Sequence, residues 1–211
     1  MARPMTDLNS GREALLDRAE ELIAQRGGVS ITLAELAAAA SMSPANLYRF
    51  FENKEALYEA VAERWFAPKV RAMEEVLASD LPIRQKFYAF YARRLTMTCD
   101  DYARDPALFR SYLELGQQHI EIVRGFIDLA DHFLAELIAE AIAEGYFAGL
   151  EIDAAVSLVN LMLQPFCDPD LIVMLLHSVS EEKLAIVVDT IFDGLRGDRP
   201  SNVKLLHRAD R

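Results

Sequence analysis

Two closely spaced helix starts near the N-terminus constrain the fold of this chain more than any other feature. Thr32 is followed three residues later by Glu35, which is the capping-box pattern that opens a helix. Ser43 then precedes Pro44, and proline suits a first helical position because the backbone N–H that it lacks would have no intrahelical acceptor there. The intervening helix has room for only about two turns, which is too short for independent stability. The sequence therefore predicts two short helices that a tight turn joins and other helices brace.

The residues around these two helix starts are predicted to stabilise the pair of short helices. Leu36, Ala37, Met42 and Leu47 are placed to form a small shared core, with Ser41 to Ser43 as the turn. A first helix from Ser10 to the glycines at 27 and 28 precedes the pair, and a fourth helix follows from Lys54 behind an Asn53 cap. This layout is typical of a helix-turn-helix unit, here at about 32–51, whose third helix from Pro44 to Phe51 can enter the major groove of DNA.

The rest of the chain continues the helical pattern. Apolar residues recur at three- and four-residue spacing, and we find no convincing alternating strand. We therefore predict an all-α fold, with an N-terminal three-helix helix-turn-helix DNA-binding domain and a larger C-terminal helical domain. The expected divisions are residues 1–56, residues 57–196, and a flexible polar tail at 197–211. Further helices are expected at 54–78, from 82 through 97, from 106, and at 120–144, 153–164 and 180–195, with a proline-bounded piece at 167–178.

The charge balance indicates weak DNA binding by a single head. The whole chain has a net charge of -11, but residues 1–56 hold six basic and eight acidic groups, so most of the acidity lies elsewhere. Within the stretch from Ser41 to Lys54, Arg49 and Lys54 are opposed only by Glu52. Phosphate contacts need local positive charge rather than a positive whole protein. The sequence predicts modest nonspecific affinity and a need for two linked heads.

This N-terminal stretch resembles the TetR family of bacterial transcriptional regulators. The resemblance covers roughly a quarter of the chain, from Arg12 to Val61. It rests on the apolar first helix, Thr32 with Leu36-Ala37, Ser41-Met42-Ser43, Leu47-Tyr48-Arg49-Phe50-Phe51 and Asn53-Lys54-Glu55-Ala56-Leu57. One departure is Ser41, where the family usually has glycine, the residue that most readily adopts positive φ. The resemblance implies a ligand-responsive repressor that binds a palindromic operator as a dimer.

The same resemblance assigns roles on the reading face. Thr32, Tyr48 and Lys54 are implied to meet phosphates, although Thr32 also serves as a cap and Tyr48 could instead be a packing aromatic. Asn46 and Arg49 are candidates for reading bases, because Asn can pair with adenine and Arg with guanine. Ala45 is short enough to meet a thymine methyl. The expected DNA-binding residues are Thr32, Ser43, Pro44, Ala45, Asn46, Tyr48, Arg49 and Lys54.

The resemblance also implies that the C-terminal part is a helical ligand-binding and dimerisation domain, which would hold the dimer interface and a pocket for a small, largely apolar effector. The helices at 153–164 and 180–195 are apolar around much of their circumference, which fits burial on more than one side, although both could be core helices of a monomer. The expected interface residues are Ala155, Leu158, Met162, Leu184, Val188, Ile191 and Leu195. The candidate pocket residues, which could equally be plain core, are Phe87, Phe90, Tyr91, Met97, Tyr112, Phe126, Phe133 and Phe166.

Several other classes find little support in the sequence. We expect no cofactor and no metal site, and no phosphate-binding glycine loop or nucleophile elbow favours an enzyme. No signal peptide, membrane span or close-spaced cysteine pair is evident, which predicts a cytoplasmic protein with reduced thiols and no membrane partner. The alternative function is a helical module that binds a small molecule or a protein and whose DNA-binding head is degenerate. An all-α enzyme is a third hypothesis.

Overall fold

The computed structural model describes residues 5–26, 28 and 30–198, and all regular secondary structure in this part of the chain is helical. The prediction of an all-α fold is therefore confirmed. The helices are α1 (Met5–Arg26), α2 (Leu33–Ala39), α3 (Pro44–Leu47), α4 (Lys54–Leu77), α5 (Ile83–Arg104), α6 (Pro106–Gln118), α7 (Ile120–Ala143), α8 (Ile152–Leu163), α9 (Pro169–Met174) and α10 (Glu181–Gly194), with a 3-10 turn η1 (Gln164–Phe166) before α9.

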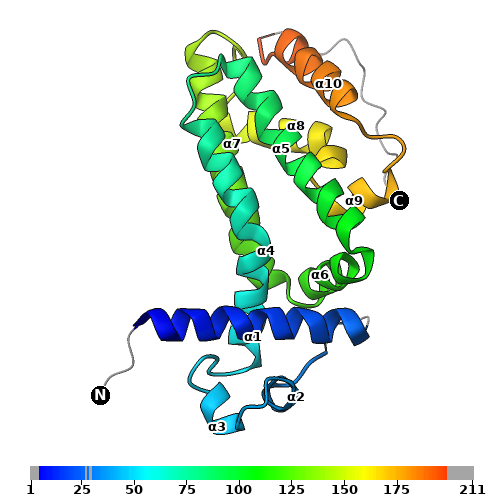
Figure 1. Cartoon of the computed structure of the whole chain (residues 1–211). Helices are drawn as coiled ribbons and strands as arrows, with labels where there is room; N and C mark the ends of the chain where they lie inside the picture. Colours follow the sequence, from blue (N-terminus) through cyan, green and yellow to red (C-terminus); the bar gives the residue numbers. More distant parts are fainter. Residues whose placement is uncertain (1–4, 27, 29, 199–211) are drawn as a thin grey trace, which may run out of the picture.

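The N-terminal head packs around its own hydrophobic core. Figure 1 shows α1 lying across the lower end of α4, with α2 and α3 below it. The core of the head includes the predicted contributors Leu36, Ala37 and Leu47, all fully buried, with Met42 packed against them. It continues along α4 through Ala62, six residues beyond the expected division at residue 56. The first turns of α4 therefore belong to the head, while the rest of the same helix runs into the larger part of the molecule.

The C-terminal body surrounds a second core. Helix α4 packs against α5 and α7, α5 packs against α10, and α7 packs against α8. Helix α6 connects the two parts, because its residue Leu115 is buried in the core of the head. No helix among the described residues is both long and apolar enough to cross a membrane.

Most helix ends follow the local signals in the sequence. The side chains of Thr32, Ser43, Asn53, Asp105 and Ser180 each cap the following helix by accepting a backbone N–H. Residues 199–211, which make up most of the predicted tail, lie outside the described residues. Gly197, at its expected start, donates its N–H to the carbonyl of Ala148 at 2.9 Å.

Two predicted helix boundaries are wrong. Helix α1 begins at Met5 rather than Ser10, because residues 5–9 include no proline or glycine that would keep the helix from extending toward the N-terminus. Helix α3 ends at Leu47 rather than Phe51. Beyond it the N–H of Arg49 and of Phe50 donate to carbonyls three residues back, and Phe51 turns into the core of the head with 1% of its surface exposed.

Candidate nucleic-acid interface and ligand cavity

The turn between α2 and α3 is built from two abutting caps. The N–H of Met42 donates to Ala37 at 2.8 Å and that of Ser41 to Ala38 at 3.1 Å, which is the Schellman pattern for ending a helix. Ser41 occupies the left-handed position of this motif with φ 53°. Two residues later the Ser43 hydroxyl accepts the N–H of Asn46 and starts α3. The departure from glycine at Ser41 thus leaves the turn in the conformation that glycine would favour.

We expect Ser41→Gly to raise the free energy of unfolding by about 0.5–1 kcal/mol. The left-handed conformation costs a non-glycine residue about 1–2 kcal/mol, and the greater freedom of glycine in the unfolded chain removes part of this gain. Urea denaturation followed by circular dichroism measures the difference. Ser30→Gly, an exposed serine outside the turn whose φ is not positive, is the matched control and should be neutral or destabilising. A Ser41→Gly variant less stable than the parent would contradict the account.

Helix α3 and the two residues after it, Tyr48 and Arg49, present most of the predicted reading residues to solvent. Pro44, Ala45 and Arg49 are exposed, and 56% of the Tyr48 surface is accessible. Asn46 is half-buried, and its backbone N–H donates to the Ser43 hydroxyl. Leu47 alone in this helix faces the core, with none of its surface exposed. The helix therefore separates one buried anchor from a polar outer face, as a recognition helix must.

Thr32 begins α2 with a capping box in which its hydroxyl both accepts and donates a hydrogen bond. Its hydroxyl accepts the Glu35 N–H at 3.2 Å and donates to the Glu35 carboxylate at 2.7 Å, which also accepts the Thr32 N–H. Arg26 from the end of α1 adds an ion pair to Glu35 at 2.6 Å. The hydrogen bond from Arg26, followed by those from Thr32, lowers the pKa of Glu35 to about 2. A phosphate contact by Thr32 stays a prediction, and the hydroxyl would have to leave Glu35 to make it.

Lys54 lies at the first position of α4, where an ammonium and free backbone N–H groups can together attract an anion. Its Nζ sits 5.0 Å from the centre of the Tyr58 ring, which orients the side chain. The Tyr58 ring in turn contacts the ring of His119, between α6 and α7, in a tilted arrangement with a centroid distance of 4.9 Å. The lysine at the edge of the head is thus linked by two ring contacts to the junction of α6 and α7.

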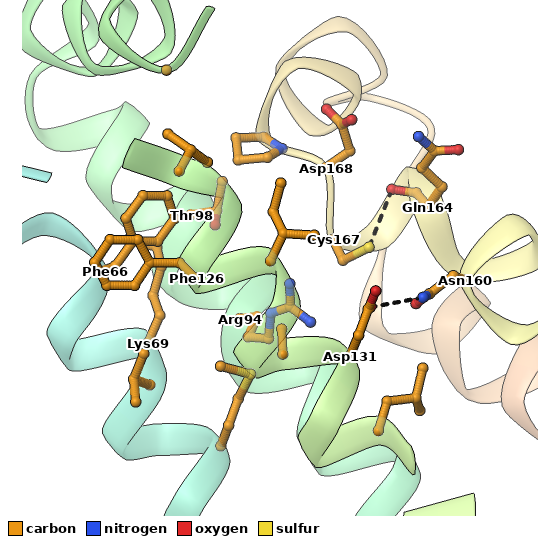
Figure 2. A pocket seen from close by; sticks show the side chains of 18 of the residues that line it. Phe66, Lys69, Arg94, Thr98, Phe126, Asp131, Asn160, Gln164, Cys167 and Asp168 are labelled. Atoms are coloured by element: carbon orange, nitrogen blue, oxygen red, sulfur yellow. Dashed lines mark hydrogen bonds between the residues drawn. The ribbon is translucent and has the colours of Figure 1, made fainter. Parts of the chain in front are cut away.

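A cavity of about 910 Å³ lies in the C-terminal body. Its wall is formed by side chains of α4, α5, α6, α7 and α8 and of the segment 164–170, and Figure 2 shows it at close range. The volume falls in the range of about 300–1,000 Å³ that is typical of sites for small organic ligands. Phe66 and Phe126 stack against each other in its wall, with ring centroids 4.4 Å apart.

The structure distributes the eight candidate pocket residues over three places. Phe90, Tyr112 and Phe126 line the cavity. Met97 lines a smaller neighbouring cavity of about 230 Å³. The remaining four do not line either cavity and belong to the hydrophobic core, because their helix faces point toward neighbouring helices; they are Phe87, Tyr91, Phe133 and Phe166.

The sequence did not predict that polar residues line the cavity. Lys69, buried on α4, donates to Asp101 at 2.7 Å, and its pKa is lowered by burial despite that carboxylate. Asn160 on α8 donates to Asp131 on α7 at 2.9 Å. Arg94 on α5 points into the space between Cys167 and Asp131 (Figure 2). In a helical sequence, charged residues at these positions look like an ordinary solvated face, so no local signal identifies them.

The residues expected at the dimer interface divide between the core and the surface. Leu158 and Met162 on α8 are 40% and 39% exposed, so they are available to a partner. Four others face the core of their own chain with at most 2% exposure, which corrects their placement: Ala155, Leu184, Val188 and Ile191. Leu195 is half-buried against the same core. On α10 the outward apolar residue is instead Ile186, which is 65% exposed.

Two family models match the chain. The model for the N-terminal region of bacterial regulatory proteins of the tetR family matches residues 15–61. The model described as a tetracyclin repressor-like C-terminal domain matches residues 84–188. The first match covers the head with its turn and α3, and the second covers most of the walls of the cavity.

Individual relatives agree with these matches. The chain is 25% identical over 126 residues to the fatty acid metabolism regulator protein of Bacillus subtilis, which is 58% of this chain and 65% of that protein. It is 34% identical over 89 residues to the HTH-type transcriptional repressor NemR of Escherichia coli, which is 42% of this chain and 45% of that one. Both matches thus span less than two thirds of the relative. The fatty acid degradation regulator FadR from Bacillus halodurans shares the fold, with a TM-score of 0.60 at 20% identity over 92% of this chain and 98% of that chain.

Proposed function

Since the chain belongs to the TetR family of bacterial regulatory proteins, whose members are DNA-binding transcriptional regulators, we propose that it is a dimeric repressor released from a palindromic operator by a small molecule. The two reading heads bind two half-sites of the operator, and the small molecule occupies the 910 Å³ cavity. Such a protein acts where the bacterial chromosome lies, in the cytoplasm.

One observation carries the ligand-responsive part of this proposal: a single helix belongs to both sites. Helix α4 starts at Lys54 in the head, and its residues Trp65, Phe66 and Lys69 form part of the cavity wall. The rise of an α-helix puts Phe66 about 18 Å from Lys54 along the axis. A ligand that displaces this wall would tilt the helix and so change where the head stands relative to its partner. A coupling of this kind is typically worth about 1–3 kcal/mol.

The junction of α6 and α7 provides a second connection between the cavity and the head. Gln117 and Ile120, on either side of His119, both line the cavity. The ring of His119 contacts that of Tyr58, and the Lys54 ammonium lies over the Tyr58 ring. Movement of the junction on ligand binding would therefore reach the same phosphate-binding lysine.

Dimerisation is supported by the exposed apolar residues of the last helices. Helices α8 and α10 pack against each other, so Leu158, Met162 and Ile186 lie on neighbouring elements. Exposed large apolar side chains on adjacent helices are typical of a protein–protein interface. In a two-fold dimer each of these residues meets the same surface of a second copy.

Selection from random DNA tests the proposal, with Arg49→Ala and Asn46→Ala as the key variants. We expect the parent protein to enrich a two-fold symmetric motif. Each variant should lose about tenfold or more in affinity for it, because one bidentate base contact is worth about 1–3 kcal/mol and each head contributes one. Operator affinity is measured by fluorescence anisotropy at fixed salt.

The matched control is Arg71→Ala, an exposed arginine of α4 outside the head. It should leave operator affinity unchanged, and sedimentation should find all variants dimeric. Unchanged affinity in both Arg49→Ala and Asn46→Ala would refute the assigned reading face. Failure of the parent to enrich any motif would instead favour a ligand-binding module with a degenerate head.

A further inference from the structure

We infer that the effector of this protein is an amphipathic anion, whose carboxylate-like head binds Arg94 and whose apolar body lies along the aromatic part of the cavity. The inference rests on the proposed function and adds the chemical class of the ligand. It is carried by the contrast between Arg94 and the other charged residues of the wall.

Arg94 is a cavity-lining cation without a hydrogen bond or an ion pair among the described residues. Its guanidinium lies 5.5 Å from the centre of the Phe90 ring, which stabilises the charge but accepts none of its in-plane N–H groups. The other lysine or arginine of the wall, Lys69, already has Asp101 at 2.7 Å. A half-buried guanidinium with unmet donors fits a ligand that brings acceptor oxygens, preferably two on one planar group.

The carboxylates of the wall fit a cationic ligand less well, because three of the four already accept hydrogen bonds. Asp131 accepts from Asn160 at 2.9 Å and Asp170 from Gln117 at 3.3 Å. Asp168 accepts the N–H of Leu171 as the cap of α9. The fourth, Asp153, is exposed in the first turn of α8, where it complements the helix dipole. Among the described residues, Arg94 thus differs from Asp131, Asp168 and Asp170 in having no hydrogen-bond partner.

The remaining wall near Arg94 suits a hydrocarbon body. Val70 and Met73 come from α4, Leu134 from α7, and the stacked rings of Phe66 and Phe126 extend the apolar surface toward the head. An apolar chain anchored at Arg94 could lie along these residues and reach Trp65 and Phe66 on α4. The anionic head group therefore sets the orientation of the ligand in the cavity. The apolar body contacts α4, the helix that begins at Lys54.

The experiment compares three probes of equal chain length by isothermal titration calorimetry, all below their micellar concentrations. The probes are dodecanoate, dodecanol and dodecyltrimethylammonium. We expect dodecanoate to bind the parent protein at least about tenfold more tightly than the alcohol or the cation. Arg94→Gln should abolish this preference and leave the affinity for dodecanol within about twofold, while Arg94→Lys should keep part of it. Arg93→Gln, which removes the adjacent exposed arginine paired with Glu75, is the matched control and should behave as the parent.

Each other outcome overturns the inference. Equal binding of dodecanoate and dodecanol, tighter binding of the cation, saturable binding of none of the three, or an unchanged carboxylate preference in a folded Arg94→Gln protein would each exclude an Arg94-anchored anion. Circular dichroism and the melting temperature report whether the variants are folded, and Arg94→Lys provides a second test if Arg94→Gln is not. Enrichment of a DNA motif without a ligand tests DNA binding separately. A negative result with the three probes would therefore exclude the inferred effector without excluding the proposed function as a DNA-binding regulator.

Discussion

Replacing Leu158 and Ile186 together with glutamate is expected to convert the protein to a monomer and to weaken operator binding by about 100-fold or more. Both side chains are large, apolar and exposed, at 40% and 65%. Because a two-fold interface repeats every residue, the double variant places four carboxylates in one dimer surface. Like charges buried together cost several kcal/mol. Analytical ultracentrifugation measures the monomer–dimer equilibrium, and anisotropy with operator DNA measures the affinity.

The loss of affinity follows from linkage of the heads rather than from damage to either one. A second head on the same dimer binds at a high effective concentration, which raises overall affinity by about 100- to 10,000-fold. With little positive charge near α3, a single head has few other contacts to rely on. Leu81→Glu replaces an exposed leucine before α5 and serves as the control, with dimer and affinity unchanged. A double variant that remains dimeric at micromolar concentration would exclude this face as the interface.

Asp101→Ala is expected to reduce the free energy of unfolding by about 3 kcal/mol. The substitution leaves the Lys69 ammonium, which is 9% exposed as a side chain, without its carboxylate partner at 2.7 Å. Removing one member of a buried pair costs about 3–5 kcal/mol, and the lower end applies because the Asp101 side chain is 25% exposed. The Trp65 ring, 4.6 Å from the Lys69 Nζ, recovers part of the loss. Urea denaturation at neutral pH measures the difference.

The pH dependence of stability shows whether Asp101→Ala is destabilised by the unpaired charge of Lys69 or by lost packing. Burial lowers the pKa of Lys69 in the folded state, and removal of Asp101 takes away the group that opposes this shift. Between the lowered folded pKa and the ordinary pKa of lysine, the unfolded chain binds more protons, so stability rises with pH. The deficit of Asp101→Ala should therefore shrink in alkaline solution. Asp100→Ala, an exposed neighbour, should show neither effect, and a deficit independent of pH would refute the charge explanation.

The local features of this protein were readable from the sequence because they depend on residues close together in the chain. The capping box of Thr32 and Glu35, the Ser43-Pro44 start and the Asn53 cap each satisfy backbone groups within one helical turn. The same locality explains the two errors at helix ends. Ser10 has capping chemistry, yet residues 5–9 contain no proline or glycine, so α1 extends back to Met5. Helix α3 ends at Leu47, and the chain beyond it turns so that Phe51 is buried in the core of the head.

Only the tertiary structure decided which side of each apolar helix is covered. On α10 the sequence pattern marks Leu184, Val188 and Ile191 as one stripe, but whether the chain or a second copy covers it depends on where α5 and α8 lie. That packing buries the stripe and leaves Ile186 outside.

The cavity depends on the tertiary structure even more, because it consists of space that several helices leave between them. Arg94 and Asp131 are far apart in sequence and come from α5 and α7, and each by itself fits a solvated helix face. The sequence by itself determined the helices and the turn, since caps and periodicity act over a few residues, whereas the residues of the reading face stay a prediction from the resemblance to the family. The cavity that Arg94 lines and the exposed side of α10 could be identified only from the tertiary structure, since both depend on contacts between helices distant in the chain.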